Sequence, residues 1–335
     1  MMSVHRSRPS SLHRSFFPRS FLHRLSARAL LPPALAVAFA LAGCGDKPSS
    51  KPHAPSAEEQ RYSEGEALWR AQRREALVTP DGWTTLVGLH RLTLKSHYVG
   101  SSERSGMRLA VGPASLGMFT RNGRGVIFTP ERGLVLTLDG QPLTDSRVAL
   151  RSDLDGAPSV LGFDDGRGQL TVIDRGGDLF LRVKHADALT RTQFKELDYW
   201  PPQLDWRIEA TFVPHPAGTT LQAVNLLGQT ETLPNPGALA FQRDGRAWQL
   251  ELVDEGDETL AVLFADATSG HETYGQGRRI DVLRPDAGGK VVLDFNRAYN
   301  PPAAFTLFTT CTTPPVQNRL DMPIRAGEKI YGGPR

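Results

Sequence analysis

The sequence predicts a mainly β protein, in which an N-terminal helix is followed by a small β-sandwich packed on a second β-rich part, sandwich-like or barrel-like. Three observations support this fold class. Glycine and proline are abundant, with 32 and 25 residues in a chain of 335. Many short runs of alternating apolar and polar residues end at Gly, Asn or Asp turns, which is typical of antiparallel sandwiches. Helical periodicity is sustained over one long stretch, from Glu58 to Val78.

Residues 1–43 have the layout of a lipoprotein signal peptide, with a positive region, an apolar run from Ala29 to Ala42, and then small residues. The apolar run is shorter than the roughly 20 residues that a membrane-spanning helix needs. It ends in Leu-Ala-Gly-Cys, a lipobox, so we expect a lipid anchor such as palmitate on Cys44. Gly45 follows instead of aspartate, which favours attachment to the periplasmic face of the outer membrane. The alternative is a signal anchor with an incidental cysteine.

The net charge of +3 also comes from this N-terminal segment. Its 43 residues contain six arginines and no acid, so without them the net charge falls to −3. The sequence therefore predicts no nucleic-acid partner. Lipid on Cys44 would block one of the two cysteines, leaving Cys311 without a disulfide partner in the oxidising periplasm.

The mature chain is expected to begin with a flexible tether, residues 44–57, which is rich in Pro, Ser and Lys. A first domain, residues 58–152, is predicted to contain the helix and the small β-sandwich. One face of the helix carries residues at steps of three and four, namely Tyr62, Glu66, Trp69, Arg73 and Leu77. We expect Trp69 to dock the helix on the body of the protein. The charges Arg70, Arg73 and Arg74 are expected to face water.

The strands expected in the first sandwich are short and separated by Gly-containing turns. They are Trp83–Leu89, Leu92–Leu94, Met107–Val111, Gly117–Arg121, Gly125–Thr129, Leu134–Leu138 and Val148–Leu150. Their order is similar to that of a forkhead-associated sandwich, although any small sandwich fits equally well. Phosphothreonine-binding members of that fold carry Ser-Arg-x-His, whereas this chain has Ser-Leu-Gly-Met at 115–118. The resemblance therefore implies a scaffold and no phosphopeptide binding.

A second domain, residues 153–335, is predicted to be β-rich and to end in a long irregular segment. Its expected strands are Gln169–Asp174, Leu179–His185, Trp206–Val213, Thr220–Asn225, Thr230–Leu233, Ala238–Arg243, Ala247–Leu252, Ala261–Ala265 and a run ending at Asp294. From Asp294 to Glu328, paired prolines and polar residues exclude a regular helix or strand. We expect this segment to lie beside the Gly-rich loop 266–279.

Candidate ligand-binding residues cluster in the loop, at the strand end and in the C-terminal segment. Arginines suit carboxylate or phosphate, and glycines let backbone N–H groups approach a ligand. The alternative is that these residues stabilise their own loops by bonding to nearby backbone. The candidates are Asp266, Ser269, His271, Thr273, Tyr274, Arg278, Asp294, Asn296, Arg297, Asn300, Asn318, Arg319 and Glu328.

Stronger catalytic signatures are absent from the sequence. It contains no HExxH, CxxC, Walker A, strand-linked GxGxxG or GxSxG motif, so we predict neither a metal site nor a cofactor. A nucleophilic Cys311 would need a base, and His271 is the histidine in a polar cluster. A buried structural cysteine is the commoner case.

Several elements together resemble the bacterial domain-of-unknown-function 1684 family. They are Trp83–Leu89, Ala265–Gly270, Leu293–Pro302, Asn318–Leu320 and Ala326–Glu328, and the resemblance extends over about residues 60–332. It implies a predominantly β fold and often an envelope lipoprotein, but it supplies no activity. Many members carry a cysteine where this chain has Ala303, so the resemblance implies that a pairing with Cys311 is lost here.

The leading hypothesis is an envelope lipoprotein that binds a small anionic ligand, or a partner, on its C-terminal β domain. The alternative is a periplasmic hydrolytic enzyme that uses a cluster of Asp266, Tyr274, Asp294 and Arg297, with Glu328 as a further candidate acid or base. The two hypotheses differ in geometry, because an enzyme needs these groups in one concave pocket. A structural or adhesive role for the first sandwich would instead require a broad exposed apolar patch.

Overall fold

A computed structural model describes residues 55–335 of the chain. The predicted signal peptide, Cys44 and the tether as far as residue 54 lie outside the described residues. No helix within 55–335 combines the length and the apolar character needed to cross a membrane.

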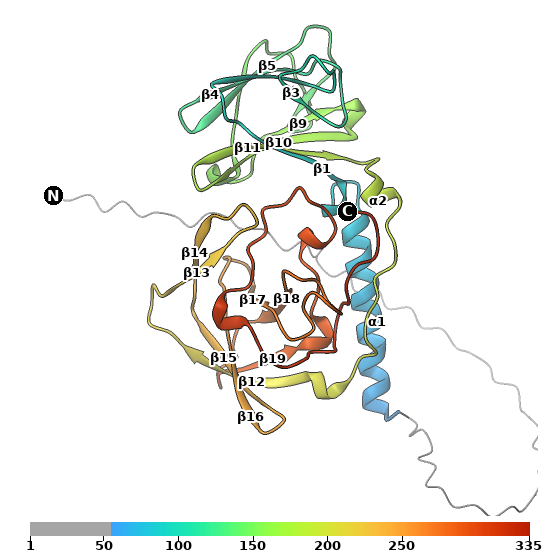
Figure 1. The fold of residues 1–335 in the computed structure, drawn as a ribbon, viewed down its shortest axis with the longest axis vertical. Coiled ribbons are helices and arrows are strands. Elements are labelled where there is room, and N and C mark those ends of the chain that lie inside the picture. Colours follow the sequence, from blue (N-terminus) through green and yellow to red (C-terminus); the bar gives the residue numbers. More distant parts are fainter. Residues whose placement is uncertain (1–54) are drawn as a thin grey trace, which may run out of the picture.

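Helix α1 (Ala57–Val78) begins and ends within one residue of the prediction. Its start is fixed by a capping box, in which the Ser56 side chain accepts from the Glu59 N–H and the Glu59 carboxylate accepts from the Ser56 N–H. Figure 1 shows α1 running along one side of the lower β unit and ending at the junction with the upper one. The helix therefore joins the two β units of the protein.

The first β unit is a sandwich of two sheets, ordered β1-β11-β10-β9-β6-β7 and β3-β2-β4-β5-β8. Its core contains Phe119, Phe128, Leu161, Leu170 and Leu181, all fully buried between the sheets. The strands are β1 Leu86–Arg91, β2 Ser96–Gly100, β3 Met107–Arg108, β4 Gly117–Asn122, β5 Gly125–Pro130, β6 Thr137–Leu138, β7 Gln141–Pro142, β8 Val148–Leu150, β9 Val160–Phe163, β10 Gly168–Arg175 and β11 Asp178–His185.

This first unit extends beyond the expected boundary after residue 152. Strand β11 pairs with β1 along Leu86–Arg91, and β9 pairs with β6, so residues 160–185 complete the first sandwich. Periodicity predicted β10 and β11 as strands. It could not show which strands they pair with, because ladder partners far apart in sequence leave no local signal.

The second β unit contains a four-stranded sheet, ordered β16-β15-β12-β19, and the hairpins β13-β14 and β17-β18. The strands are β12 Arg207–Pro214, β13 Thr220–Val224, β14 Thr230–Pro234, β15 Gly237–Arg243, β16 Arg246–Glu251, β17 Thr259–Phe264, β18 Arg278–Leu283 and β19 Lys290–Asp294. Phe295 lies at the centre of its core, with Trp206, Phe241 and Phe264 around it at ring-centroid distances of 5.6 to 5.8 Å. The described sheets stay open, so of the two predicted forms the sandwich-like one is observed.

The segment after β19 has little regular structure, as predicted, and it includes the short 3-10 turns Phe295–Arg297, Pro302–Ala304 and Val316–Asn318. It packs against the 266–279 loop and its flanks, because Ala265 bridges Arg319 and Arg279 bridges Tyr299. Gly327 adopts a φ of 77°, and a Cβ there would lie 2.3 Å from the Ala298 carbonyl. The expected juxtaposition of the two segments is confirmed.

A third apolar cluster seals the junction between helix α1, the 266–279 loop and the C-terminal segment. It contains Leu77 from α1, Tyr274 from the loop, and Phe305, Cys311 and Tyr331 from the C-terminal segment. Phe194, which follows the short helix α2 (Leu189–Thr192), stacks on Tyr331 with the ring centroids 5.3 Å apart. The cluster therefore ties the end of α1 to the loop and to the C-terminal segment.

Candidate functional site

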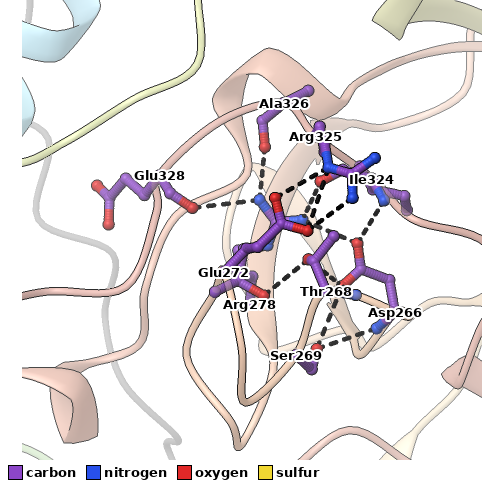
Figure 2. A network of polar contacts seen from close by, with 10 residues as sticks. Asp266, Thr268, Ser269, Glu272, Arg278, Ile324, Arg325, Ala326 and Glu328 are labelled. Carbon is purple, nitrogen blue, oxygen red and sulfur yellow. Dashed lines mark hydrogen bonds and ion pairs between the residues drawn. The ribbon is translucent and has the colours of Figure 1, made fainter.

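The loop cluster centres on a buried ion pair between Asp266 and Arg278 (Figure 2). Arg278 Nη2 lies 3.2 Å from Asp266 Oδ2, and the side chains are 1% and 0% exposed. The guanidinium also donates to the carbonyls of Ile324, Ala326 and Glu328. Burial lowers the pKa of Arg278, while the Asp266 carboxylate opposes that shift. This arginine ties the C-terminal segment to β18 and presents almost no surface to a ligand.

The remaining loop candidates divide into structural and exposed residues. The Thr268 and Ser269 hydroxyls donate to Asp266 Oδ1, and Thr273 lies 2.9 Å from Thr268 through their hydroxyl oxygens. Tyr274 is buried in the junction cluster, whereas His271 is exposed. The loop is thus built around its own hydrogen bonds.

Three asparagines supply hydrogen bonds where the irregular backbone lacks a ladder. Asn318 donates to the Glu251 and Leu263 carbonyls and accepts from the Glu251 N–H. Asn296 exchanges two hydrogen bonds with the backbone of Gln203. The backbone N–H of Asn300 donates to Glu328 Oε2 at 2.7 Å. Glu328 and the three asparagines are buried, whereas Arg319 is exposed.

The strand-end candidates contact helix α1, about 230 residues earlier in the chain. Tyr62 Oη donates to both oxygens of Asp294, at 2.8 and 2.9 Å. One turn later, Arg297 Nε donates to Glu66 Oε1 at 2.7 Å. Glu66 is fully buried. The sequence placed it on the same helical face as Trp69 but gave no sign that the carboxylate would be buried. The polar face of α1 therefore provides the partners of the predicted site.

Further along α1, Arg73 pairs with Glu328 at 3.0 Å and donates to the Asn300 carbonyl. Its guanidinium lies 4.5 Å from the ring centroid of Tyr299, and its side chain is 12% exposed. The expectation that Arg73 faces water is wrong. Its partners come from the far end of the chain, so helical periodicity alone could not reveal them.

A groove opens where the N-terminal half of α1 meets β18, β19 and the start of β12. It has a volume of about 630 Å³, within the usual size range of ligand sites, and we call it the α1 groove. Its polar lining includes Arg61 and Tyr62 from α1, Arg207 from β12, and Asp294 and Arg297. Of the predicted site residues, the structure brings Asp294 and Arg297 to this groove, whereas Asp266 and Tyr274 are not in its lining. Sequence reasoning missed Arg61 and Arg207, for which no local motif exists.

The arginines of the groove are only partly engaged. Arg297 is 44% exposed, and Arg207, whose Nε is 4.0 Å from Asp294 Oδ2, is 48% exposed. Arg61 is exposed on the first turns of α1. Guanidinium groups held at a surface in this way can take carboxylate or phosphate oxygens.

The groove is poorly suited to proton transfer. Asp294 accepts from the Tyr62 hydroxyl and also from the N–H and side-chain amide of Asn296, so its oxygens are occupied. Burial, and then the Asp294 charge, raise the pKa of Tyr62. Burial also raises the pKa of Glu66. These groups hold the helix and the arginines in place.

The thiol proposal also lacks the required geometry. Cys311 is buried in the junction cluster, and burial raises the pKa of its thiol, which opposes thiolate formation. His271, the potential base, is exposed on the loop. Within residues 55–335, no group of three or more His, Cys, Asp or Glu side chains is arranged to hold a metal ion.

Comparisons with known proteins concern mainly the second unit. Residues 192–329 match the model of a family described as protein of unknown function, DUF1684. An uncharacterized protein of Haloarcula marismortui, with a solution NMR structure, is 30% identical over 41% of this chain and 77% of its own, with a TM-score of 0.35. No curated protein matches the chain. On the family match, the chain belongs to the DUF1684 family of proteins of unknown function.

Proposed function

We propose that this protein is an envelope lipoprotein whose second unit binds a small anionic ligand in the α1 groove. The proposed anchor is lipid on Cys44, at the periplasmic face of the outer membrane. The lipobox and the preceding positive and apolar regions support this anchor. The ligand site is a refinement of the predicted one, because it keeps Asp294 and Arg297 and adds groups from α1 and β12.

The observation that carries the proposal is the arrangement of Arg297. Its Nε donates to buried Glu66, while the side chain is partly exposed and lines the groove. Arg61 and Arg207 line the same groove. A fork of donors fixed at one nitrogen is preorganised for an oxyanion.

Two of the three acids that line the groove already have partners, whereas the third, Glu58, is exposed on the first turn of α1. Asp281 accepts from Arg279 Nε and from the Tyr299 hydroxyl, both at 2.7 Å. Asp294 accepts from Tyr62 and Asn296. One carboxylate, that of Glu58, thus stands against three partly engaged guanidinium groups, and this balance favours an anion over a cation.

The test is binding of phosphate and citrate to the full chain, purified in detergent, by isothermal titration calorimetry. Native mass spectrometry of the same preparation would detect a ligand retained during purification. We expect saturable binding that the double variant Arg61→Ala/Arg207→Ala weakens at least about tenfold, since a charged hydrogen bond contributes roughly 1.5–3 kcal/mol. Arg147→Ala is the matched control, because Arg147 is exposed on the first unit. Equal affinity in the double variant and the control would refute the site.

A further inference from the structure

The α1 groove has a second property, which concerns the backbone of the strands that line it. Strand β18 pairs only with β17, and β19 pairs only with β12, among the described strands. Both strands contribute residues to the groove lining, and each has one edge without a partner strand. An unpaired edge presents main-chain donors and acceptors at regular spacing.

The hydrogen bonds on either side show which peptide groups face the groove on β18. Arg279 exchanges two backbone hydrogen bonds with Tyr299, on the side away from β17. Ala261 lies opposite Asp281 on β17, but its backbone N–H and C=O groups bond to Val253 and not to Asp281. Because bonding alternates along an antiparallel pair, Asp281 and Leu283 also direct their N–H and C=O groups away from β17.

The same alternation applies to β19. Phe212 N–H donates to the Gly289 carbonyl, which makes the β12 pairs of Val291 and Leu293 the hydrogen-bonded ones. Val292 and Asp294 therefore direct their peptide groups away from β12. Lys290, the residue before this stretch, has its own peptide groups bonded to Asp286. The free edge of β19 thus begins at Val292.

Aliphatic side chains border these edges on their outer face. Leu283 is 75% exposed and Val292 is 44% exposed, although both lie on strands whose neighbouring residues are buried in the core. An inorganic anion can accept from strand-edge N–H groups, but it uses neither the C=O groups beside them nor the aliphatic surface. A peptide uses both, since its main chain bonds to the edge and its side chains pack beside it.

We propose that the ligand of the α1 groove is a short, extended peptide that carries acidic side chains. Its main chain hydrogen-bonds the free edges of β18 and β19, and its carboxylates pair with Arg61, Arg207 and Arg297. This inference rests on the proposed function and names its ligand class. The groove volume of about 630 Å³ limits the bound segment to a few residues.

The experiment selects binders from a positional-scanning pentapeptide library with the full chain in detergent, using affinity-selection mass spectrometry. We expect enrichment of peptides containing Asp or Glu. The best peptide is then remade with N-methyl groups at successive amides, and we expect at least about a tenfold rise in Kd at alternate positions, because each lost main-chain bond leaves a partner unpaired. Arg207→Ala should weaken binding similarly, and Arg147→Ala should leave it unchanged.

A pair of variants tests the protein side of the same contact. Val292→Pro removes an N–H that faces the groove and leaves the β12 ladder intact, whereas Val292→Ala keeps that N–H. We expect Val292→Pro alone to abolish peptide selection. If Val292→Pro does not fold, the N-methyl series still decides the question from the peptide side.

The outcomes separate the two proposals. Binding of phosphate or citrate without selection of any peptide would overturn the peptide inference and leave anion binding in place. Selection of basic peptides, or N-methylation without effect at every position, would also overturn it. Failure of phosphate, citrate and peptides alike would remove the proposed function together with this inference.

Discussion

The clearest test of how the second unit is held together is Arg278→Met. Methionine keeps much of the side-chain volume but removes every donor from a site that is 1% exposed. Breaking a buried ion pair by removing one partner costs about 3–5 kcal/mol. Three carbonyls, those of Ile324, Ala326 and Glu328, would also lose a donor, and each orphaned group costs roughly 1–3 kcal/mol. We therefore expect a loss of at least about 5 kcal/mol, comparable to the whole stability of many domains.

The assay is urea unfolding followed by tryptophan fluorescence, with Arg325→Met as the matched control. Arg325 lies in the same segment and pairs with Glu272, but both side chains are exposed, at 57% and 40%. An exposed pair contributes about 0–1 kcal/mol, so the control should stay close to the unsubstituted protein. Arg278→Lys adds an intermediate case, because one ammonium group cannot reach all the acceptors of a guanidinium. A loss below about 1 kcal/mol in Arg278→Met would refute the reasoning, given the buried-pair range above.

Three further predictions follow from single residues. Because burial raises the pKa of Glu66, the folded state binds its proton more tightly than the unfolded state does. The stability that this proton confers is therefore lost as the pH rises above the ordinary glutamate pKa of about 4, and Glu66→Gln should flatten that decline in urea midpoints; a steeper decline in the variant would contradict the sign. The Cys311 thiol, which is buried and has a raised pKa, should resist iodoacetamide at pH 8 until urea unfolds the protein, and rapid alkylation of the native chain would argue against its burial. Cys44→Ala should move the protein from the membrane to the soluble fraction on cell fractionation, whereas membrane retention would favour a signal anchor.

Local signals predicted the elements better than their pairing. The predicted bounds of α1 came from helical periodicity and from the stop signal Thr79-Pro80, which are local features, whereas the Ser56 cap emerged only from the structure. Turn residues such as Arg175-Gly-Gly-Asp178 located the β10-β11 hairpin. Strand β18 was not predicted, since Arg278 and Arg279 at its start read as part of a polar loop. Their burial depends on acceptors supplied by the C-terminal segment and by acids elsewhere in the second unit.

For the candidate site, too, the sequence identified residues but not the partners that they contact. The polar residues at the end of β19 were identified by composition, and the structure brings Asp294 and Arg297 to the groove. Composition cannot distinguish a residue that binds a ligand from one that binds its own chain. Tyr62 and Glu66, the partners of these two residues, are separated from them by 232 and 231 positions. The sequence placed both partners on one helical face but carried no sign of what that face would meet.

The length of helix α1 and its closeness to Cys44 in the sequence limit how far the groove can lie from a lipid anchor. Its 22 residues form a rod about 33 Å long, with the groove beside its first turns and the first β unit beyond its last. Ser56 lies twelve positions after Cys44, a span of at most about 43 Å when the chain is fully extended. A lipid on Cys44 would therefore confine the groove to a shell of about that depth above the bilayer. Ligands released near the membrane surface would meet this protein at a much higher local concentration than ligands in the surrounding fluid.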